Sequence, residues 1–125
     1  MRTEVRHAVN PEVPSEAYVA FNANVNPEST NSLLTVLTQL SQAGTKRVVL
    51  CMSSGGGQVA TAIGLMNLLP QLPIELVTHN IAQVGSAGNL LFLCGAKRFA
   101  NQNALFFVHR PTWSPMDGRE FMQRL

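Results

Sequence analysis

This chain has 125 residues and a mass of 13.6 kDa, which suits one domain whose core needs no disulfide or metal ion to hold it together. Charged residues make up only 13% of it, about half of the usual share, and Glu75 is the one formal charge between Val48 and Ala96, so this stretch is predicted to be core, site or interface. A net charge of +2 with basic residues in scattered pairs argues against a nucleic-acid partner. The sequence has neither a signal-peptide pattern nor an apolar window of membrane length, which predicts a cytoplasmic protein without a membrane segment.

The first part of the chain predicts an arm, a strand and a helix. Residues 1–16 are polar and contain two prolines, so we expect an arm outside a domain that spans residues 17–125. The β-type run 17–21 predicts a strand. Asn26, followed by a proline and an acidic residue, is typical of a helix start, and Gly44 is expected to end a helix whose leucines repeat at helical spacing.

The rest of the chain alternates strand and helix patterns. Residues 47–52 form a short apolar run without alternation, which predicts a strand covered on both faces of a parallel sheet. We expect, in chain order, a helix over 58–69, a strand over 74–79, a helix that ends at Gly95, and strands over 97–100 and 105–109 around an Asn-Gln-Asn turn. This alternation predicts an α/β fold with a mainly parallel sheet and right-handed crossovers.

Turns of small residues follow two of the predicted strands, at residues 53–57 and 83–88. The carboxyl ends of parallel strands meet at one edge of the sheet, so we expect both turns there. Ser86 lies between glycine and alanine neighbours that leave its hydroxyl open, but a serine needs a base to become a nucleophile. His109, at the end of an apolar strand, could be that base, and the glycine N–H groups could stabilise an oxyanion. Together these groups predict acyl transfer.

The residues alone leave other interpretations open. Ser86 could simply be the N-cap of the following helix. The glycine-rich turn matches neither the P-loop nor the dinucleotide-binding pattern, and Val84 occupies the first glycine position of the G-x-S-x-G motif of α/β-hydrolases. His79, at the expected end of the third strand, could contact substrate or be a partly exposed strand end. Cys51 and Cys94 lie in apolar runs without metal-ligand spacing, and are predicted to be buried thiols.

Several linked motifs resemble, in order and spacing, the proteolytic subunit of the Clp protease family. Residues 52–59 (Met-Ser-Ser-Gly-Gly-Gly-Gln-Val) are similar to the family's Asn-Ser-Pro-Gly-Gly segment. Residues 83–88 (Gln-Val-Gly-Ser-Ala-Gly) are similar to its Gln-Ala-Ala-Ser-Met-Gly nucleophile turn. Residues 95–100 and 107–111 resemble its Gly-Ala-Lys…Arg-Phe and Ile-His-Gln-Pro stretches.

This resemblance implies a fold of repeated strand-strand-helix units, as in crotonases, and a serine-type endopeptidase that cleaves unfolded polypeptides through an acyl-enzyme. It implies a homo-oligomeric ring, an ATP-dependent unfoldase as a possible partner, and no cofactor or metal for the bond cleavage. The residue roles that it implies are Ser86 as nucleophile, His109 as general base, the N–H groups of Gly56 and Ala87 as the oxyanion hole, and Gly57 and Gln58 as substrate-binding residues.

The chain also departs from the family pattern. Gly55 replaces the family's proline, and Ser53 replaces its asparagine. The family's catalytic acid lies well beyond its histidine, whereas this sequence stops 16 residues after His109. The third triad member, the rest of the handle helix and the family's carboxyl-terminal part are therefore expected to be missing. Asp117, the only aspartate, falls on a segment similar to the start of that helix and is not assigned to the triad.

Two other functions therefore stay open beside the peptidase. The missing acid favours a catalytically silent structural subunit of a Clp-type ring. A crotonase-type acyl-CoA enzyme would share the fold and the paired N–H groups, but the pairing of Ser86 with His109 argues against it, and Glu75 is the only carboxylate in its region.

Overall fold

A five-stranded parallel sheet is the centre of the computed structural model, which describes residues 14–109. The strands run in the order β1-β2-β3-β4, and β5 also pairs with β3. This confirms the predicted parallel α/β sheet. The elements in chain order are β1 (Glu16–Asn22), α1 (Pro27–Ala43), β2 (Arg47–Ser54), α2 (Val59–Leu68), a 3-10 turn η2 (Leu69–Gln71), β3 (Glu75–Gly85), α3 (Gly88–Phe92), β4 (Lys97–Ala100) and β5 (Leu105–Phe107).

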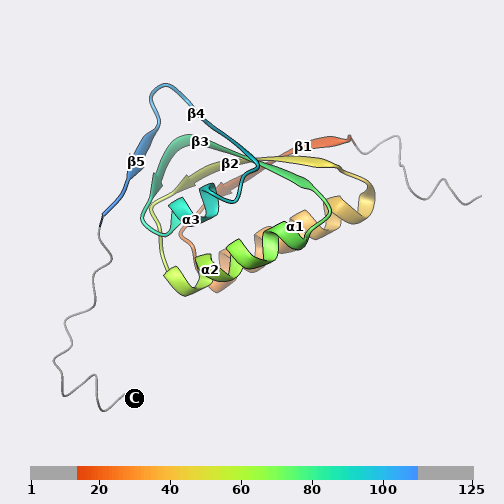
Figure 1. The fold of residues 1–125 in the computed structure, drawn as a ribbon, viewed down its shortest axis with the longest axis horizontal. Helices are drawn as coiled ribbons and strands as arrows, with labels where there is room; N and C mark the ends of the chain where they lie inside the picture. Colours follow the sequence, from red (N-terminus) through yellow and green to blue (C-terminus); the bar gives the residue numbers. More distant parts are fainter. Residues whose placement is uncertain (1–13, 110–125) are drawn as a thin grey trace, which may run out of the picture.

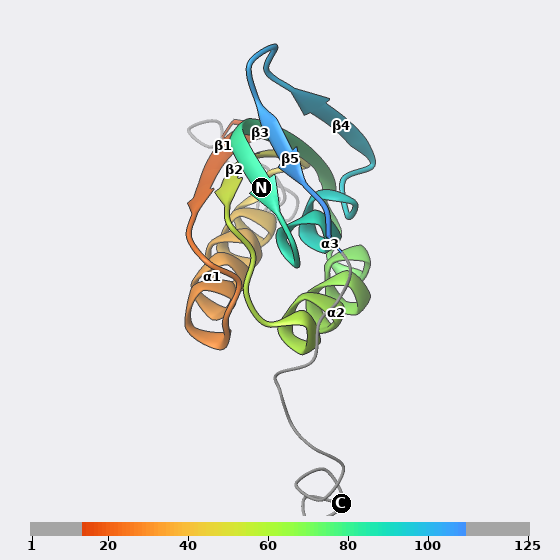
Figure 2. The same ribbon diagram turned by 90° about the vertical axis from the view of Figure 1, so that its left-hand side faces the viewer.

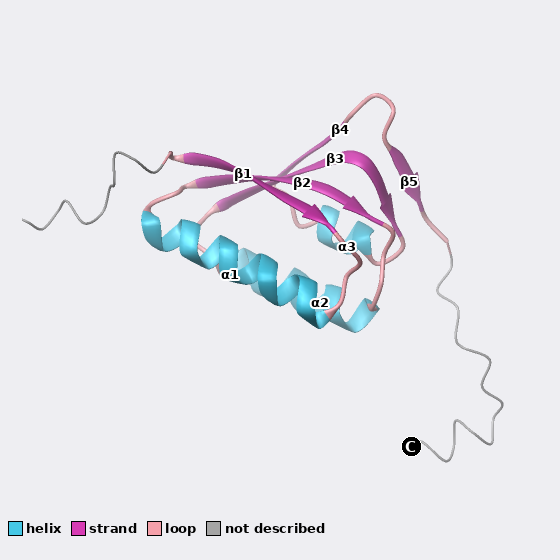
Figure 3. Ribbon diagram, turned by 180° about the vertical axis from the view of Figure 1, so that it is seen from behind, coloured by secondary structure: helices cyan, strands magenta, loops and turns pink. Residues whose placement is uncertain are grey.

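The helices α1, α2 and α3 all lie on one face of the sheet (Figures 1 and 3). The core lies between them and the sheet, and its fully buried side chains include Leu37 of α1, Leu50 and Met52 of β2, Val84 of β3 and Leu91 of α3. Burial of each such side chain contributes roughly 1.5–3 kcal/mol to folding.

The other face of the sheet carries no helix among the described residues, which corrects the prediction that β2 is covered on both faces (Figures 1 and 2). Successive side chains of a strand point to opposite faces, so Cys51 lies opposite the buried Leu50 and Met52. Cys51 and Cys94 are both only partly buried, and the prediction that they are core thiols is wrong to that extent. Cys94 donates to the carbonyl of Leu90 at 3.3 Å, and burial raises the pKa of its thiol.

The sequence signals at both ends of α1 are confirmed. The side chain of Asn26 accepts from the N–H of Ser29 at 2.9 Å, and Ser29 Oγ accepts from the N–H of Asn26 at 3.2 Å, which satisfies N–H groups that the first turn leaves unpaired. Gly44 ends the helix with φ +109°, a conformation that glycine adopts at low cost. The strand that follows begins at Arg47, as expected.

β3 is longer than the sequence indicated, because it ends at Gly85 and not at His79. It pairs with β4 along residues 77–80 and with β5 along 83–85, on the same edge (Figure 2). Asn80 makes this continuation possible: it is fully buried, its Nδ2 donates to the carbonyl of Leu105 at 2.9 Å, and its Oδ1 accepts from the N–H of Ala82 at 3.1 Å. His79 is therefore inside the strand, where its ring bonds to the side chain of Asn101.

The remaining elements follow the sequence patterns closely. β4 has the predicted bounds, whereas β5 ends at Phe107, so that His109 lies just beyond it. The second helical segment ends near Pro70, as predicted, with its last turn in the 3-10 form. Most of the predicted arm 1–16, and the segment that contains Asp117, lie outside the described residues. Within residues 14–109, no helix has the length and apolar character needed to cross a bilayer.

Candidate active site

The turns that follow β2 and β3 lie at one edge of the sheet, as the sequence predicted, and they touch each other. A Cβ atom placed on Gly56 would lie 2.6 Å from the Cβ of Ser86 and 3.3 Å from the backbone nitrogen of Ala87. The first distance is shorter than Cβ atoms show in proteins, so any side chain at this position would displace Ser86 or the turn itself. The absence of a side chain at Gly56 thus lets the first turn pack directly against the backbone that carries the serine.

The first turn owes its shape to glycines in the left-handed region. Gly56 has φ +115° and Gly57 has φ +149°. Their backbone is held by Val25, whose N–H donates to the carbonyl of Gly56 at 2.7 Å and whose carbonyl accepts from the N–H of Gln58 at 2.8 Å. A Cβ on Gly57 would lie 2.1 Å from the carbonyl oxygen of Val25. The turn is therefore fixed against the chain that leaves β1.

The N–H groups of the two glycines point to different environments. Gly56 is buried, and its N–H donates to Ser54 Oγ at 3.2 Å. Gly57 is exposed, and within residues 14–109 its N–H donates to no other residue. Since the carbonyl of Gly56 and the N–H of Gln58 both face Val25, backbone alternation directs the N–H of Gly57 to the opposite side. The geometry thus makes Gly57, and not Gly56, the donor that a substrate could reach.

The second turn places a serine in a conformation that serines rarely adopt. Ser86 has φ +50°, and it is the one non-glycine residue with positive φ in the described part of the chain. For an L-residue this region costs on the order of 1–2 kcal/mol, so its neighbours must hold it there. The N–H of Ser86 donates to the carbonyl of Phe107 at 3.0 Å, and its own carbonyl accepts from the N–H of Asn89 at 3.0 Å. The N-cap of α3 is Ala87 and makes no side-chain cap bond, which corrects the interpretation of Ser86 as the cap.

A cavity of about 390 Å³ opens at these turns. Among the residues predicted for the site, Ser86, Ala87, Gly57 and His109 line it. Gly56 does not line it, because it lies buried beneath Ser86. Gln58 is exposed beside the turn, and its side chain accepts from Thr61 Oγ1 at 3.1 Å.

Sequence reasoning missed part of the lining: Val59, Leu90 and Val108, which supply an apolar wall, and Asn89, which supplies an amide. The apolar residues give no signal of their own, because they look like the other apolar residues of α2, of α3 and of the segment around β5. Asn89 does give one, since it is a polar residue in the otherwise apolar segment Gly-Asn-Leu-Leu-Phe.

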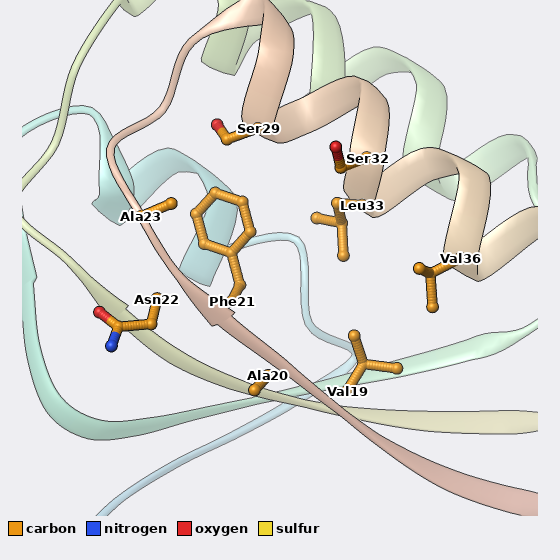
Figure 4. A pocket seen from close by; sticks show the side chains of 9 residues that line it. All are labelled: Val19, Ala20, Phe21, Asn22, Ala23, Ser29, Ser32, Leu33 and Val36. Carbon is orange, nitrogen blue, oxygen red and sulfur yellow. The ribbon is translucent and has the colours of Figure 1, made fainter.

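Another cavity, of about 270 Å³, lies between β1 and α1 (Figure 4). Val19 and Phe21 of the strand point toward Leu33 and Val36 of the helix across it, and the side chains from the helix also include serines. None of the predicted site residues lines this cavity. This cavity therefore lies apart from the site.

The carboxylate and the second histidine considered for chemistry lie elsewhere. Glu75 begins β3 and pairs with Arg47 at 3.4 Å, whereas Gly85 ends the same strand. Glu75 is therefore at the opposite end of an eleven-residue strand from the nucleophile turn. His79 bonds to Asn101 and does not line the cavity. Within the described part of the chain, no cluster of three or more His, Cys, Asp or Glu could hold a metal ion.

Comparisons with known proteins agree with this architecture. The family model described as "Clp protease" matches residues 2–119. The chain is 28% identical over 94 residues to "ATP-dependent Clp protease proteolytic subunit 1" of Leifsonia xyli subsp. xyli, a match that covers 73% of this chain and 48% of the relative. It is 29% identical over 99 residues to the "ATP-dependent Clp protease proteolytic subunit" of Cucumis sativus, with coverages of 77% and 51%. The chain thus spans about half the length of the curated relatives it matches.

Solved structures show the same fold. "ClpP1 from Listeria monocytogenes" superposes with a TM-score of 0.72 at 18% identity, and the match covers 86% of this chain and 64% of that one. "Crystal structure of the ClpP protease catalytic domain from Plasmodium falciparum" gives a TM-score of 0.67 at 15% identity, with coverages of 72% and 53%. The Clp protease fold that the sequence motifs implied is therefore confirmed.

Proposed function

Because this chain belongs to the Clp protease family, we propose that it is a subunit of a serine-type endopeptidase, with Ser86 as nucleophile and His109 as general base. The observation that carries this proposal is the contact between the two turns, where Gly56 leaves room for Ser86 beside an open cavity that His109 also lines. A nucleophile, a base and backbone donors at one cavity are the groups that acyl transfer requires.

In the proposed reaction, Ser86 Oγ attacks the carbonyl carbon of a peptide bond while His109 takes the hydroxyl proton. The carbonyl oxygen becomes an oxyanion, which accepts hydrogen bonds from the N–H groups of Gly57 and Ala87. The C–N bond then breaks, His109 gives the proton to the leaving amine, and Ser86 is left acylated. His109 then takes a proton from a water molecule whose oxygen attacks the acyl carbon. The bond from this carbon to Ser86 Oγ breaks, His109 returns the proton to Oγ, and the acid that is released loses its own proton to solvent as a carboxylate.

The oxyanion assignment differs in one residue from the expectation for Gly56. Within residues 14–109, the N–H groups of Gly57 and Ala87 donate to no other residue, and both residues line the cavity. The N–H of Gly56 is occupied by Ser54 Oγ. We therefore assign Gly56 the role of making room for Ser86, and Gly57 the role of donor.

The proposed substrate is an unfolded polypeptide in an extended form. An apolar wall of Val59, Leu90 and Val108 suits the side chain of such a segment, and the exposed Gln58 lies next to the turn that would bind its backbone.

Family membership supports a homo-oligomeric ring and an ATP-dependent unfoldase as partner, and the cleavage itself needs no cofactor. Large apolar side chains are exposed along β5 and beyond it, which is the kind of surface that assembly covers: Leu105, Phe106, Phe107 and Val108. The position of Glu75, far from Ser86, disfavours the crotonase-type reaction.

The test is cleavage of a fluorogenic unstructured peptide by the wild type, by Ser86→Ala and by the control Ser32→Ala, which removes a hydroxyl from the other cavity. We expect Ser86→Ala to lose all cleavage and Ser32→Ala to keep it, both with the circular dichroism spectrum of the wild type. Cleavage that survives in Ser86→Ala would contradict the assignment. A folded wild type that neither cleaves nor reacts with a fluorophosphonate would be a silent structural subunit.

A further inference from the structure

We infer that Asn89 is a positioning residue, which orients the Ala87 N–H as an oxyanion donor and ties the nucleophile turn to the segment that leads to His109. The inference rests on the function proposed above. Asn89 lines the same cavity and is the first residue after the glycine that opens α3.

The side-chain amide of Asn89 bridges two backbone carbonyls. Its Nδ2 donates to the carbonyl of Ser86 at 3.1 Å and to that of Phe107 at 3.0 Å. Carbonyl oxygens only accept hydrogen bonds, so the NH₂ group and not the amide oxygen must face them. Both donor hydrogens of the amide are thereby used, and its orientation is fixed.

The bond to Ser86 controls the direction of a neighbouring N–H group. The carbonyl of Ser86 and the N–H of Ala87 belong to one planar trans peptide unit, so they point in opposite directions. This carbonyl accepts both from the backbone N–H of Asn89, at 3.0 Å, and from its side chain. With the carbonyl held from one side by two donors, the Ala87 N–H is held facing the other way. An oxyanion donor stabilises the transition state only if it already points to the reacting oxygen.

The bond to Phe107 fixes the base segment relative to the nucleophile. The carbonyl of Phe107 also accepts from the N–H of Ser86 at 3.0 Å, so one carbonyl at the end of β5 receives two donors from the nucleophile turn. His109 follows that carbonyl closely in the chain. α3 has only five residues, too few to be stable by itself, so the turn depends on such outside bonds.

Asn80 provides a matched control. Its Nδ2 also donates to a carbonyl of β5, that of Leu105 at 2.9 Å, but at the start of the strand. Its hydrogen bonds go to Leu105 and Ala82, and within residues 14–109 it makes none to the peptide unit between Ser86 and Ala87. Loss of Asn80 therefore loosens the pairing of β5 without removing a bond to the oxyanion donor.

The experiment compares Asn89→Leu, which keeps the approximate shape but removes the donors, with Asn80→Leu. We expect Asn89→Leu to lower the rate of fluorophosphonate labelling at Ser86 and the kcat for the peptide by about 10- to 100-fold, with KM nearly unchanged, because the lost interaction acts in the transition state. Asn80→Leu should lower Tm, because Asn80 is buried, but should label at close to the wild-type rate per folded molecule. Equal labelling of Asn89→Leu and the wild type would overturn the inference and leave the proposed function standing.

A second measurement tests the inference even if the wild type does not label, a result that would contradict the proposed function. In the NMR spectrum of the full chain, the side-chain NH₂ protons of Asn89 should exchange with water more slowly than those of Asn31, which is exposed on α1. Asn89→Leu should shift the amide resonance of Ala87, and Asn80→Leu should leave it in place. Exchange as fast as that of Asn31, or an unmoved Ala87 resonance, would show that Asn89 does not hold this peptide unit.

Discussion

The turns after β2 and β3 face the same cavity, but they are held in shape by different means. The first turn uses Gly56 and Gly57 at φ angles that suit glycine, and two hydrogen bonds with Val25 hold its backbone in place. The second uses Ser86 at φ +50°, and its shape depends on hydrogen bonds from Asn89 and to Phe107. Glycine thus lets the first turn adopt its shape at low conformational cost, whereas the second turn keeps a strained serine only because its neighbours bond to it. Substitutions should therefore damage the two turns in different ways.

The largest effect is expected for Gly57→Ala. The new Cβ would lie 2.1 Å from the carbonyl oxygen of Val25 and 2.8 Å from its nitrogen, and backbone atoms cannot move aside cheaply. We expect the free energy of unfolding, measured with urea, to fall by about 3 kcal/mol or more, because both steric overlap and an unfavourable φ contribute. A loss below about 1 kcal/mol would mean that Val25 does not hold the turn.

Gly56→Ala should affect the chemistry more than the stability. Its Cβ would lie 2.6 Å from the Cβ of Ser86, which can move only together with the Ser86 backbone, and 3.0 Å from the carbonyl oxygen of Gly85. We expect a loss of about 1–3 kcal/mol in stability and of about 100-fold or more in the fluorophosphonate labelling rate, because a displaced nucleophile no longer meets its donors. Labelling at the wild-type rate would show that the two turns do not need this contact.

The strain at Ser86 can be measured by comparing two substitutions that both remove the hydroxyl. Ser86→Gly relieves the positive φ, whereas Ser86→Ala retains it. We expect the glycine variant to be the more stable by about 0.5–1 kcal/mol. Glycine removes the conformational cost of the positive φ, and the larger entropy that it gives the unfolded chain cancels only part of this gain. If alanine were the more stable residue, the serine would not be strained.

Gly64→Ala should have the smallest effect and the opposite sign. Gly64 lies within α2, and a Cβ placed there would meet nothing within 4 Å. Alanine in a helix interior is more favourable than glycine by about 0.5–1 kcal/mol, so Tm should rise slightly. A fall in Tm would show that glycine substitutions destabilise this chain for reasons other than the turn geometry.

Features that depend on local sequence were predictable. Asn26 and Gly44 mark the ends of α1 by short-range rules, and the alternation of strands and helices indicated the parallel sheet. Ser86 and His109 were singled out because a strand end brings each to one edge. These inferences need only the neighbouring residues and the general geometry of parallel sheets.

Features that depend on pairing between distant segments were not predictable. β3 continues past His79 because β5 pairs with its second half. Asn80 is polar, which in the sequence indicates a residue after the end of a strand, but in the structure its amide donates to the carbonyl of Leu105 within the sheet. Gly56 and Gly57 are adjacent glycines, and only the bonds to Val25 and Ser54 show which N–H stays available. The role of Asn89 requires the carbonyl of Phe107, which lies in a later strand.

The central claim is that Ser86 is a nucleophile whose oxyanion would lie between the N–H groups of Gly57 and Ala87. The most direct test is a crystal structure of the full chain after treatment with a fluorophosphonate, because the phosphonyl oxygen of the adduct occupies the place of an oxyanion. We predict an adduct on Ser86 Oγ with this oxygen at about 2.7–3.1 Å from both nitrogens. No adduct on Ser86, or an oxygen bonded to the N–H of Gly56 with Ser54 displaced, would contradict the account.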